Sequence, residues 1–150
     1  MGSDAREFDL EEANGLVPRL TLEFARLARL REEIATIASD LGGAEAAVGF
    51  LERTRVPAAG EVRSTEQLRA LADDVNRTLE RIQELGCVVK DVELGLVDFY
   101  SAVEGKRVFL CWQFGEGVIS YFHGLDEGFS ERRPLLVDDD GEGLTARWVN

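Results

Sequence analysis

The chain has 150 residues with 45 % hydrophobic and 31 % charged side chains, and its formal net charge at pH 7 is −12. A chain of this length and composition is typical of one globular domain that folds without a disulfide or a metal. Its negative charge repels phosphate backbones and anionic membrane surfaces, so we expect no nucleic-acid partner and no membrane partner.

The N-terminal sequence and the cysteines indicate the compartment. The first residues, MGSDAREFD, lack the basic region and apolar core of a secretory signal. The longest apolar runs are far shorter than the roughly 20 residues of a membrane span. We therefore expect a cytoplasmic protein in which Cys87 and Cys111 are free thiols.

Residues 9–86 predict a helical hairpin. Asp9 and Glu12 have the spacing of a capping box at the start of a first helix, and apolar residues then recur at helical spacing. Pro18 lies inside this pattern, where it is expected to kink or restart the helix. The pair Gly42-Gly43 is expected to end the helix.

A second helix is expected after an irregular connector. Ser64 and Gln67 have capping-box spacing at its start, and Gly86 fits its C-terminal stop. Two helices with matching apolar stripes form an antiparallel hairpin. Because the hairpin cannot cover both its own stripes and a sheet face, we expect part of it to form the seam of a homodimer.

From Gly86 the apolar period changes to two, which predicts an antiparallel β-meander over residues 87–123. Its glycine turns separate four strands, expected at 87–90, 96–100, 106–114 and 118–123. The expected fold is therefore a single α+β domain over residues 1–150, in which the helical hairpin packs on the meander. Residues 124–150 are expected to form an irregular acidic segment with a solvated run at 138–142 and one further small hairpin.

Several short motifs in the meander form a recognisable set. They are VKD-x3-GLVDF from Val89, G-x2-V-x-LCW-x2-GE from Gly105, I-x-Y-x-H from Ile119 and GF-x2-R-x-P from Gly128. Together with Phe8, Glu12-Ala13-Asn14 and Pro18, they resemble the uncharacterised bacterial family labelled domain of unknown function 2203, over about residues 8 to 136. One departure is Phe122, where the family usually has tryptophan. The resemblance implies the fold boundaries and a bacterial cytoplasmic origin, and it implies no reaction.

Charged residues at the strand ends are the candidate site. Asp91 and Asp98 bracket the turn at Gly95, where they could hold Mg²⁺, act as an acid and base pair, or accept hydrogen bonds from turn amides. Asp98 is expected to be partly buried and therefore to need a partner. The candidate partners are the cations Lys90, Arg107, Arg132 and Arg133.

Two further residues complete the candidate set. Glu116 lies between two glycines, where it is either solvated, part of a site with His123, or bound to an arginine. His123 is the only side chain expected to titrate near neutral pH, and it acts either as a structural hydrogen-bonding residue or as an acid–base group. The candidate binding residues are thus Lys90, Asp91, Asp98, Glu116, His123 and Arg132.

The turn before the fourth strand decides whether Cys111 can meet His123. A two-residue turn at Glu116-Gly117 pairs Leu110 with His123 and puts Cys111 on the opposite face. A three-residue turn pairs Cys111 with Tyr121 and puts His123 on the same face as the thiol. We favour the first arrangement, because it gathers the apolar residues of both strands on one face.

The sequence predicts no metal site and no cofactor. There is one histidine, the two cysteines are far apart, and no phosphate loop, nucleophile elbow or dinucleotide fingerprint is present. We expect a cytoplasmic, homodimeric binding or assembly module without enzymatic activity, for an unidentified small-molecule ligand or a partner. The alternative is a small Mg²⁺- or Mn²⁺-assisted hydrolase that uses Asp98, Glu116 and His123.

Overall fold

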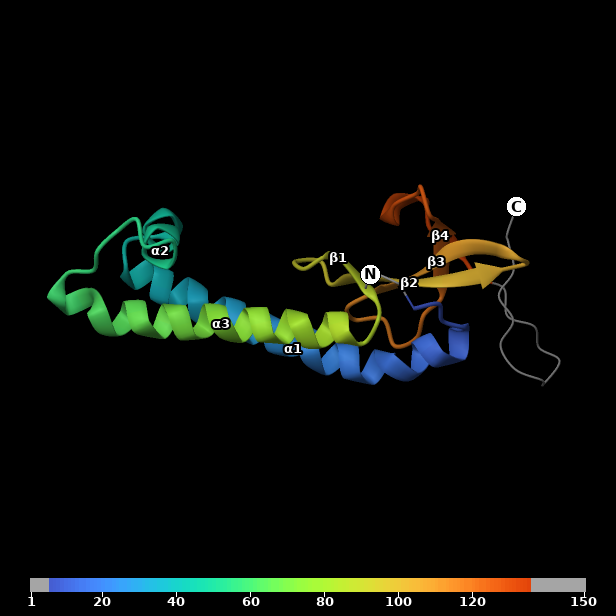
Figure 1. Ribbon diagram of the computed structural model, residues 1–150, viewed down its shortest axis with the longest axis horizontal. Helices are drawn as coiled ribbons and strands as arrows, with labels where there is room; N and C mark the ends of the chain where they lie inside the picture. Colours follow the sequence, from blue (N-terminus) through green and yellow to red (C-terminus); the bar gives the residue numbers. More distant parts are fainter. Residues whose placement is uncertain (1–5, 136–150) are drawn as a thin grey trace. The chain divides into compact units, whose positions relative to one another are not determined.

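The computed structural model describes residues 6–135, and these form two compact units (Figure 1). One unit comprises residues 6–22 and 82–135 and contains the β-sheet. The other comprises residues 23–81 and is helical. The acidic run at 138–142 and the further hairpin expected beyond residue 135 lie outside the described residues.

The first helix begins as the sequence predicts. Helix α1 (Leu10–Asp40) follows a capping box in which the amide of Glu12 donates to Asp9 Oδ1 at 2.7 Å and the amide of Asp9 donates to Glu12 Oε1 at 3.0 Å. Pro18 lies inside α1, which continues past it without a break. The predicted restart at this proline is therefore wrong. Pro18 removes one backbone donor from α1, and the remaining hydrogen bonds of this long helix hold it together.

Two short helical elements lie between the first and the last long helix. Helix α2 (Ala44–Leu51) and the 3₁₀ turn η1 (Ala59–Glu61) precede α3 (Val62–Glu84). The predicted cap at Ser64 is wrong, because Ser64 lies inside α3. The amide of Ala58 instead donates to Glu61 Oε1 at 3.0 Å, so η1 supplies the start of this helix.

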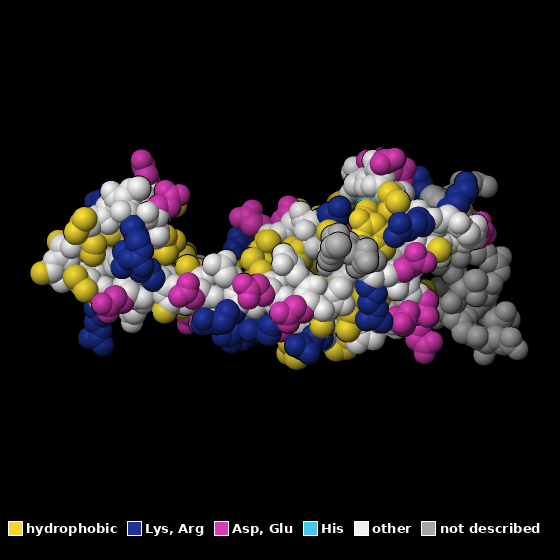
Figure 2. Space-filling model, viewed as in Figure 1, with side chains coloured by type: hydrophobic (Ala, Val, Ile, Leu, Met, Phe, Trp, Pro, Cys, Tyr) yellow, Lys and Arg dark blue, Asp and Glu magenta, His cyan; other side chains and the backbone are white. Residues whose placement is uncertain are grey.

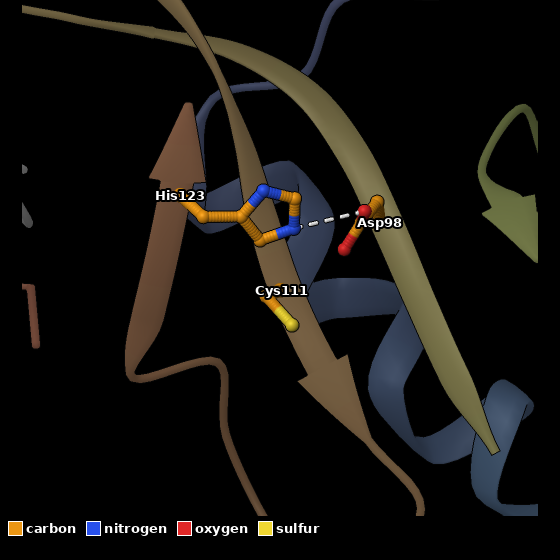
Figure 3. A group of neighbouring side chains, drawn as sticks. All are labelled: Asp98, Cys111 and His123. Atoms are coloured by element: carbon orange, nitrogen blue, oxygen red, sulfur yellow. Dashed lines mark hydrogen bonds and ion pairs between the residues drawn. The ribbon is translucent and has the colours of Figure 1, made fainter. Parts of the chain in front are cut away.

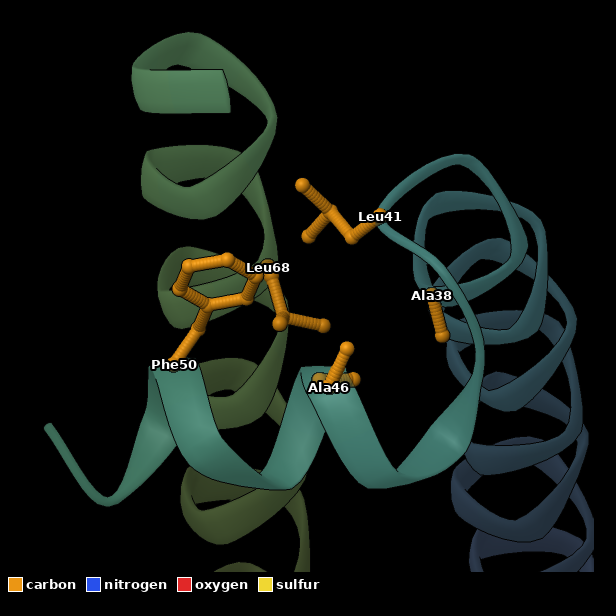
Figure 4. Packing of buried hydrophobic residues seen from close by; sticks show 6 residues of the cluster. Ala38, Leu41, Ala46, Phe50 and Leu68 are labelled. Atoms are coloured by element: carbon orange, nitrogen blue, oxygen red, sulfur yellow. The ribbon is translucent and has the colours of Figure 1, made fainter. Parts of the chain in front are cut away.

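The helical unit has its own core. It consists of small and large apolar side chains from α1, the turn that follows it, α2 and α3 (Figure 4), which are Ala38, Leu41, Ala46, Ala47, Phe50 and Leu68. Between α1 and α3, both nitrogens of one edge of the Arg81 guanidinium bind the Glu23 carboxylate, at 3.0 and 3.1 Å. These contacts confirm that the first and last helices pack together.

The sheet is a five-stranded antiparallel meander in the order β1-β2-β3-β4-β5. The sequence predicts about four strands. The fifth strand has only two residues and follows the short 3₁₀ helix η2 (Phe129–Glu131). The strands are β1 (Val88–Asp91), β2 (Leu96–Val103), β3 (Lys106–Gln113), β4 (Tyr121–Gly124) and β5 (Arg133–Pro134). The predicted α+β fold is confirmed.

The register between β2 and β3 follows from a local turn. Glu104 and Gly105 connect the strands with φ of 52° and 81°, the left-handed values of a two-residue hairpin turn. Val103 therefore pairs with Lys106, and counting inward from this pair places Asp98 opposite Cys111.

The register between β3 and β4 corrects the favoured prediction. Cys111 pairs with Tyr121 and Phe109 with His123, so Leu110 faces Phe122 rather than His123. The connection is also longer than a tight turn, because β4 begins at Tyr121 instead of residue 118. A shift of one residue moves every side chain to the other face, so His123 lies on the same face as Cys111.

The two faces of the sheet differ in their neighbours. Phe99 and Leu110 share one face, where Phe99 meets the ring of Phe8 edge-on at 5.0 Å just before α1. On the same unit the amide of Ile119 donates to Asn14 Oδ1 of α1 at 2.7 Å. The opposite face carries Asp98, Cys111 and His123.

On the face shown in Figure 2, acidic and basic side chains lie among one another. Within the described residues, no single helix is long and apolar enough to cross a membrane, and only the pair α1 and α2, bent by 100° at their break, passes that test on length and composition.

Candidate functional site

Three polar side chains meet on one face of the sheet (Figure 3). Asp98 comes from β2, Cys111 from β3 and His123 from β4, and each residue is only 2 % exposed. His123 Nε2 lies 3.0 Å from Asp98 Oδ2. The thiol sulfur, a carboxylate oxygen and an imidazole nitrogen all lie within 4.8 Å of one another.

Backbone pairing holds these three side chains in place. Asp98 is directly opposite Cys111, and His123 lies two residues beyond the partner of Cys111 on β4. Side chains on one face of neighbouring strands lie close enough to interact directly or diagonally. The site is therefore built on regular strands rather than on loops.

The hydrogen bonds of His123 fix where its protons lie. Nδ1 is 2.8 Å from the carbonyl oxygen of Gly124, which can only accept, so Nδ1 carries a hydrogen. The second nitrogen, Nε2, faces the Asp98 carboxylate, and one proton lies between His123 Nε2 and Asp98 Oδ2. Burial by itself would lower the pKa of His123, but the hydrogen bond to Asp98, with help from Cys111 and Gly124, outweighs burial and raises the pKa to about 10.

A cavity of about 190 Å³ opens beside the three side chains. Lys90, Glu127 and Phe129 are among the residues that complete its wall. The amide of Gly124 and the guanidinium of Arg133 both bind Glu127, and they lower the pKa of its carboxyl. This carboxylate is thus already engaged by two donors.

A larger cavity of about 510 Å³ lies in the helical unit, between α1 and α3. Ile37 and Leu71 contribute to its apolar lining, and Glu33 and Asp74 are its carboxylates. Its lining contains neither histidine nor cysteine. The smaller cavity is therefore the better candidate for chemistry.

Glu116 and Arg132 form an ion pair in which both side chains are partly buried. Arg132 Nη2 lies 3.0 Å from Glu116 Oε2, and the guanidinium stacks 4.1 Å from the Tyr121 ring centre and 4.2 Å from that of Phe129. Burial opposes the charge of Arg132, but the Glu116 carboxylate more than offsets it and raises the arginine pKa. Of the three alternatives for Glu116, the structure shows the one in which it binds an arginine.

The remaining predicted site residues have turn and packing contacts. Asp91 Oδ1 accepts a hydrogen bond from the amide of Leu94 at 2.9 Å, as an aspartate in a turn commonly does. The Lys90 ammonium lies 4.7 Å from the ring centre of Phe109, at the cavity. The expectation that a lysine or arginine neutralises Asp98 is wrong, since His123 is its partner.

Cys111 is the member of this group that is not among the candidate binding residues predicted from the sequence. Its pairing with Asp98 follows from the Glu104-Gly105 turn, so a strict count along the hairpin could have found it. The meeting with His123 depends on the register of β4, for which the sequence leaves two alternatives. Both Cys87 and Cys111 are free, as expected, and both are buried. Burial raises the pKa of the Cys87 thiol to about 11.

Comparisons with known proteins define the family. No curated protein and no solved structure gave a significant match. A family model described as an uncharacterized conserved protein, DUF2203, matches residues 6–135. This match covers most of the chain and confirms the resemblance seen in the sequence motifs. The chain therefore belongs to the DUF2203 family of uncharacterized conserved proteins.

Proposed function

We propose that the protein is a metal-binding module whose ligand is a zinc ion held by Asp98, Cys111 and His123. One observation carries this proposal: an oxygen, a sulfur and a nitrogen donor from three strands lie within 4.8 Å of one another. In a tetrahedral zinc site with bonds of roughly 2.0–2.3 Å, the ligand atoms are separated by about 3–4 Å. Small side-chain movements would therefore bring all three atoms onto one ion.

The orientation of His123 supports the same conclusion. A histidine that binds a metal through one nitrogen usually donates the hydrogen of the other to a carbonyl or a carboxylate. His123 Nδ1 has this arrangement with the Gly124 carbonyl, so Nε2 points to Asp98 and Cys111. In the metal-free protein a proton shared with Asp98 occupies the position that the ion would take.

The donor set favours zinc over magnesium. Thiolate and imidazole suit Zn²⁺, whereas Mg²⁺ prefers oxygen ligands. The hydrolase considered from the sequence requires Glu116 beside Asp98 and His123, but Glu116 binds Arg132 and the amide of Gln113. The binding module expected from the sequence is thus the better-supported alternative, with a metal ion as its ligand in place of the expected absence of metal.

The two cysteines allow a matched test by thermal unfolding of untagged protein. A ligand present at about 100 times its Kd stabilises the folded state by about 2.7 kcal/mol, which raises the Tm of a chain of this size by roughly 5–10 °C. We expect Zn²⁺ to raise the Tm of the wild type and of the control variant Cys87→Ser, and to have little effect on Cys111→Ser. Mg²⁺ is expected to leave all three unchanged.

The control is well matched because Cys87 is also buried and donates its thiol hydrogen to the Ile82 carbonyl at 3.4 Å, a bond that serine can replace. Two results would overturn the proposal. One is the absence of any Zn²⁺ shift in the wild type, and the other is an equal shift in Cys111→Ser and Cys87→Ser.

A further inference from the structure

We infer that the ion bound by Asp98, Cys111 and His123 keeps a fourth coordination position that takes a small oxyanion, with Lys90 as its second positive contact. This inference rests on the proposed zinc site and names the class of molecule that the site binds. It follows from the number of protein ligands, the cavity beside them and the charges that line the cavity.

The ligand count leaves one position open. Zinc sites that serve only structure have four protein ligands, whereas sites that bind an exchangeable molecule have three. Within residues 6–135, the potential metal-binding group that contains these side chains has three members. Glu127 is the further carboxylate on the cavity wall, and the Gly124 amide and Arg133 bind its two oxygens at 2.7 and 2.6 Å.

The open position faces a small space. The cavity that borders the three ligands has a volume of about 190 Å³, below the roughly 300–1,000 Å³ of sites for drug-sized molecules. A molecule that binds the ion from this side is therefore smaller than a drug-sized ligand, and both acetate and phosphate fit the space.

The charge around the cavity favours an anion. A Zn²⁺ ion bound to one thiolate, one carboxylate and a neutral imidazole forms a unit without net charge. Lys90 lines the same cavity, and no carboxylate among the described residues forms an ion pair with it. Arg133 balances Glu127. An oxyanion would therefore meet the ion with one oxygen and the Lys90 ammonium with another.

Cobalt provides the readout, since Co²⁺ replaces Zn²⁺ in such sites and its visible absorption responds to a change of ligand. Co²⁺-loaded protein is titrated with acetate, with inorganic phosphate and with acetamide, the neutral counterpart of acetate. We expect saturable spectral changes with the two anions and none with acetamide. The affinities of acetate and phosphate, compared with each other, show whether the site prefers a carboxylate or a phosphate.

The two lysines of the chain, Lys90 and Lys106, supply matched variants. Lys106 begins β3 beside the Glu104-Gly105 turn, five residues from Cys111 along the strand. We expect Lys90→Met to weaken anion binding about tenfold, the loss of one charge-assisted contact, and Lys106→Met to bind as the wild type does.

The possible failures are distinct. If Co²⁺ and Zn²⁺ do not bind, the proposed metal site itself is wrong. If the metal binds but acetate and phosphate leave the cobalt spectrum unchanged, the metal site stands and the oxyanion inference is overturned. Equal anion affinity in Lys90→Met and Lys106→Met would overturn the role of Lys90.

Discussion

Both ring nitrogens of His123 face groups that accept hydrogen bonds, the Gly124 carbonyl and the Asp98 carboxylate. A buried carboxylate or imidazolium alone is costly, because each loses its hydration. Together with one shared proton, Asp98 and His123 have no net charge. This neutrality explains how the two titratable side chains can be buried on one face of the sheet, where each is only 2 % exposed.

The first prediction concerns this pair. Removing one member of a buried ion pair costs about 3–5 kcal/mol, because the other member stays without its partner. We expect Asp98→Ala to lower the free energy of unfolding by about this amount in metal-free protein, measured by urea denaturation. The double variant with His123→Ala should cost clearly less than the sum of the two single variants.

Asp91→Ala is the control, since it removes one turn hydrogen bond and should cost only about 0.5–1.5 kcal/mol. Additive effects of Asp98→Ala and His123→Ala would show that the two side chains do not stabilise each other.

At the scale of single residues, the sequence predicted the burial of Asp98 and its need for a partner. The identity of that partner could not be predicted, because it depends on which face of β4 carries His123. A shift of one residue decides this, and both registers bury apolar side chains: Leu110 faces Phe122 in the observed pairing.

At the scale of elements, the sequence can predict a strand register that a local turn sets. It cannot predict a register that also depends on distant residues. The turn at Glu104-Gly105 sets the register of β2 and β3 by its own backbone geometry. The connection from β3 to β4 has a local hydrogen bond from the Gln113 amide to Glu116. It also depends on residues from elsewhere, because Asn14 of α1 binds the amide of Ile119 and Arg132 binds Glu116. The contact between Asn14 and Ile119 spans 105 residues, so it leaves no pattern in the connecting sequence itself.

The second prediction concerns the capping box of α1. Hydrogen bonding from the Asp9 amide, with help from Arg6, lowers the pKa of Glu12 below its ordinary value of 4.5. Because the folded-state pKa is the lower one, the charged form stabilises the fold above the unfolded-state pKa. This contribution is lost as the pH falls through the folded-state pKa.

We therefore expect Glu12→Gln to have a lower Tm than the wild type at about pH 7, and the difference to be clearly smaller at about pH 3. Thermal unfolding followed by circular dichroism measures both. Glu32→Gln, which removes a charge from an exposed part of α1 outside the capping box, is the matched control. A gap of the same size at both pH values would contradict the role of the Glu12 charge.

At the scale of the whole molecule, composition and periodicity predicted the α+β class and the meander, while the division into two compact units was not predicted. The expected absence of nucleic-acid and membrane partners, the cytoplasmic location and the single domain stay predictions. So does the homodimer, for which the helical unit offers exposed apolar side chains: Val48, Val56 and Val62 are 49 %, 88 % and 41 % exposed.

The third prediction is the mass of the protein in solution. If a helical seam joins two copies, light scattering after size exclusion should give twice the 16.6 kDa of one chain. Val48→Asp should shift the population toward the monomer, because it places a charge on the most exposed of these apolar residues that lies inside a helix. A monomeric mass at high protein concentration would remove the homodimer.

The central claim is that Asp98, Cys111 and His123 form a metal site. Native mass spectrometry of untagged protein, incubated with equimolar Zn²⁺ and then desalted, tests it most directly. We predict one zinc ion per chain in the wild type and in Cys87→Ser, and its loss in Cys111→Ser. A wild type without bound zinc, or zinc retained equally by Cys111→Ser, would contradict the claim.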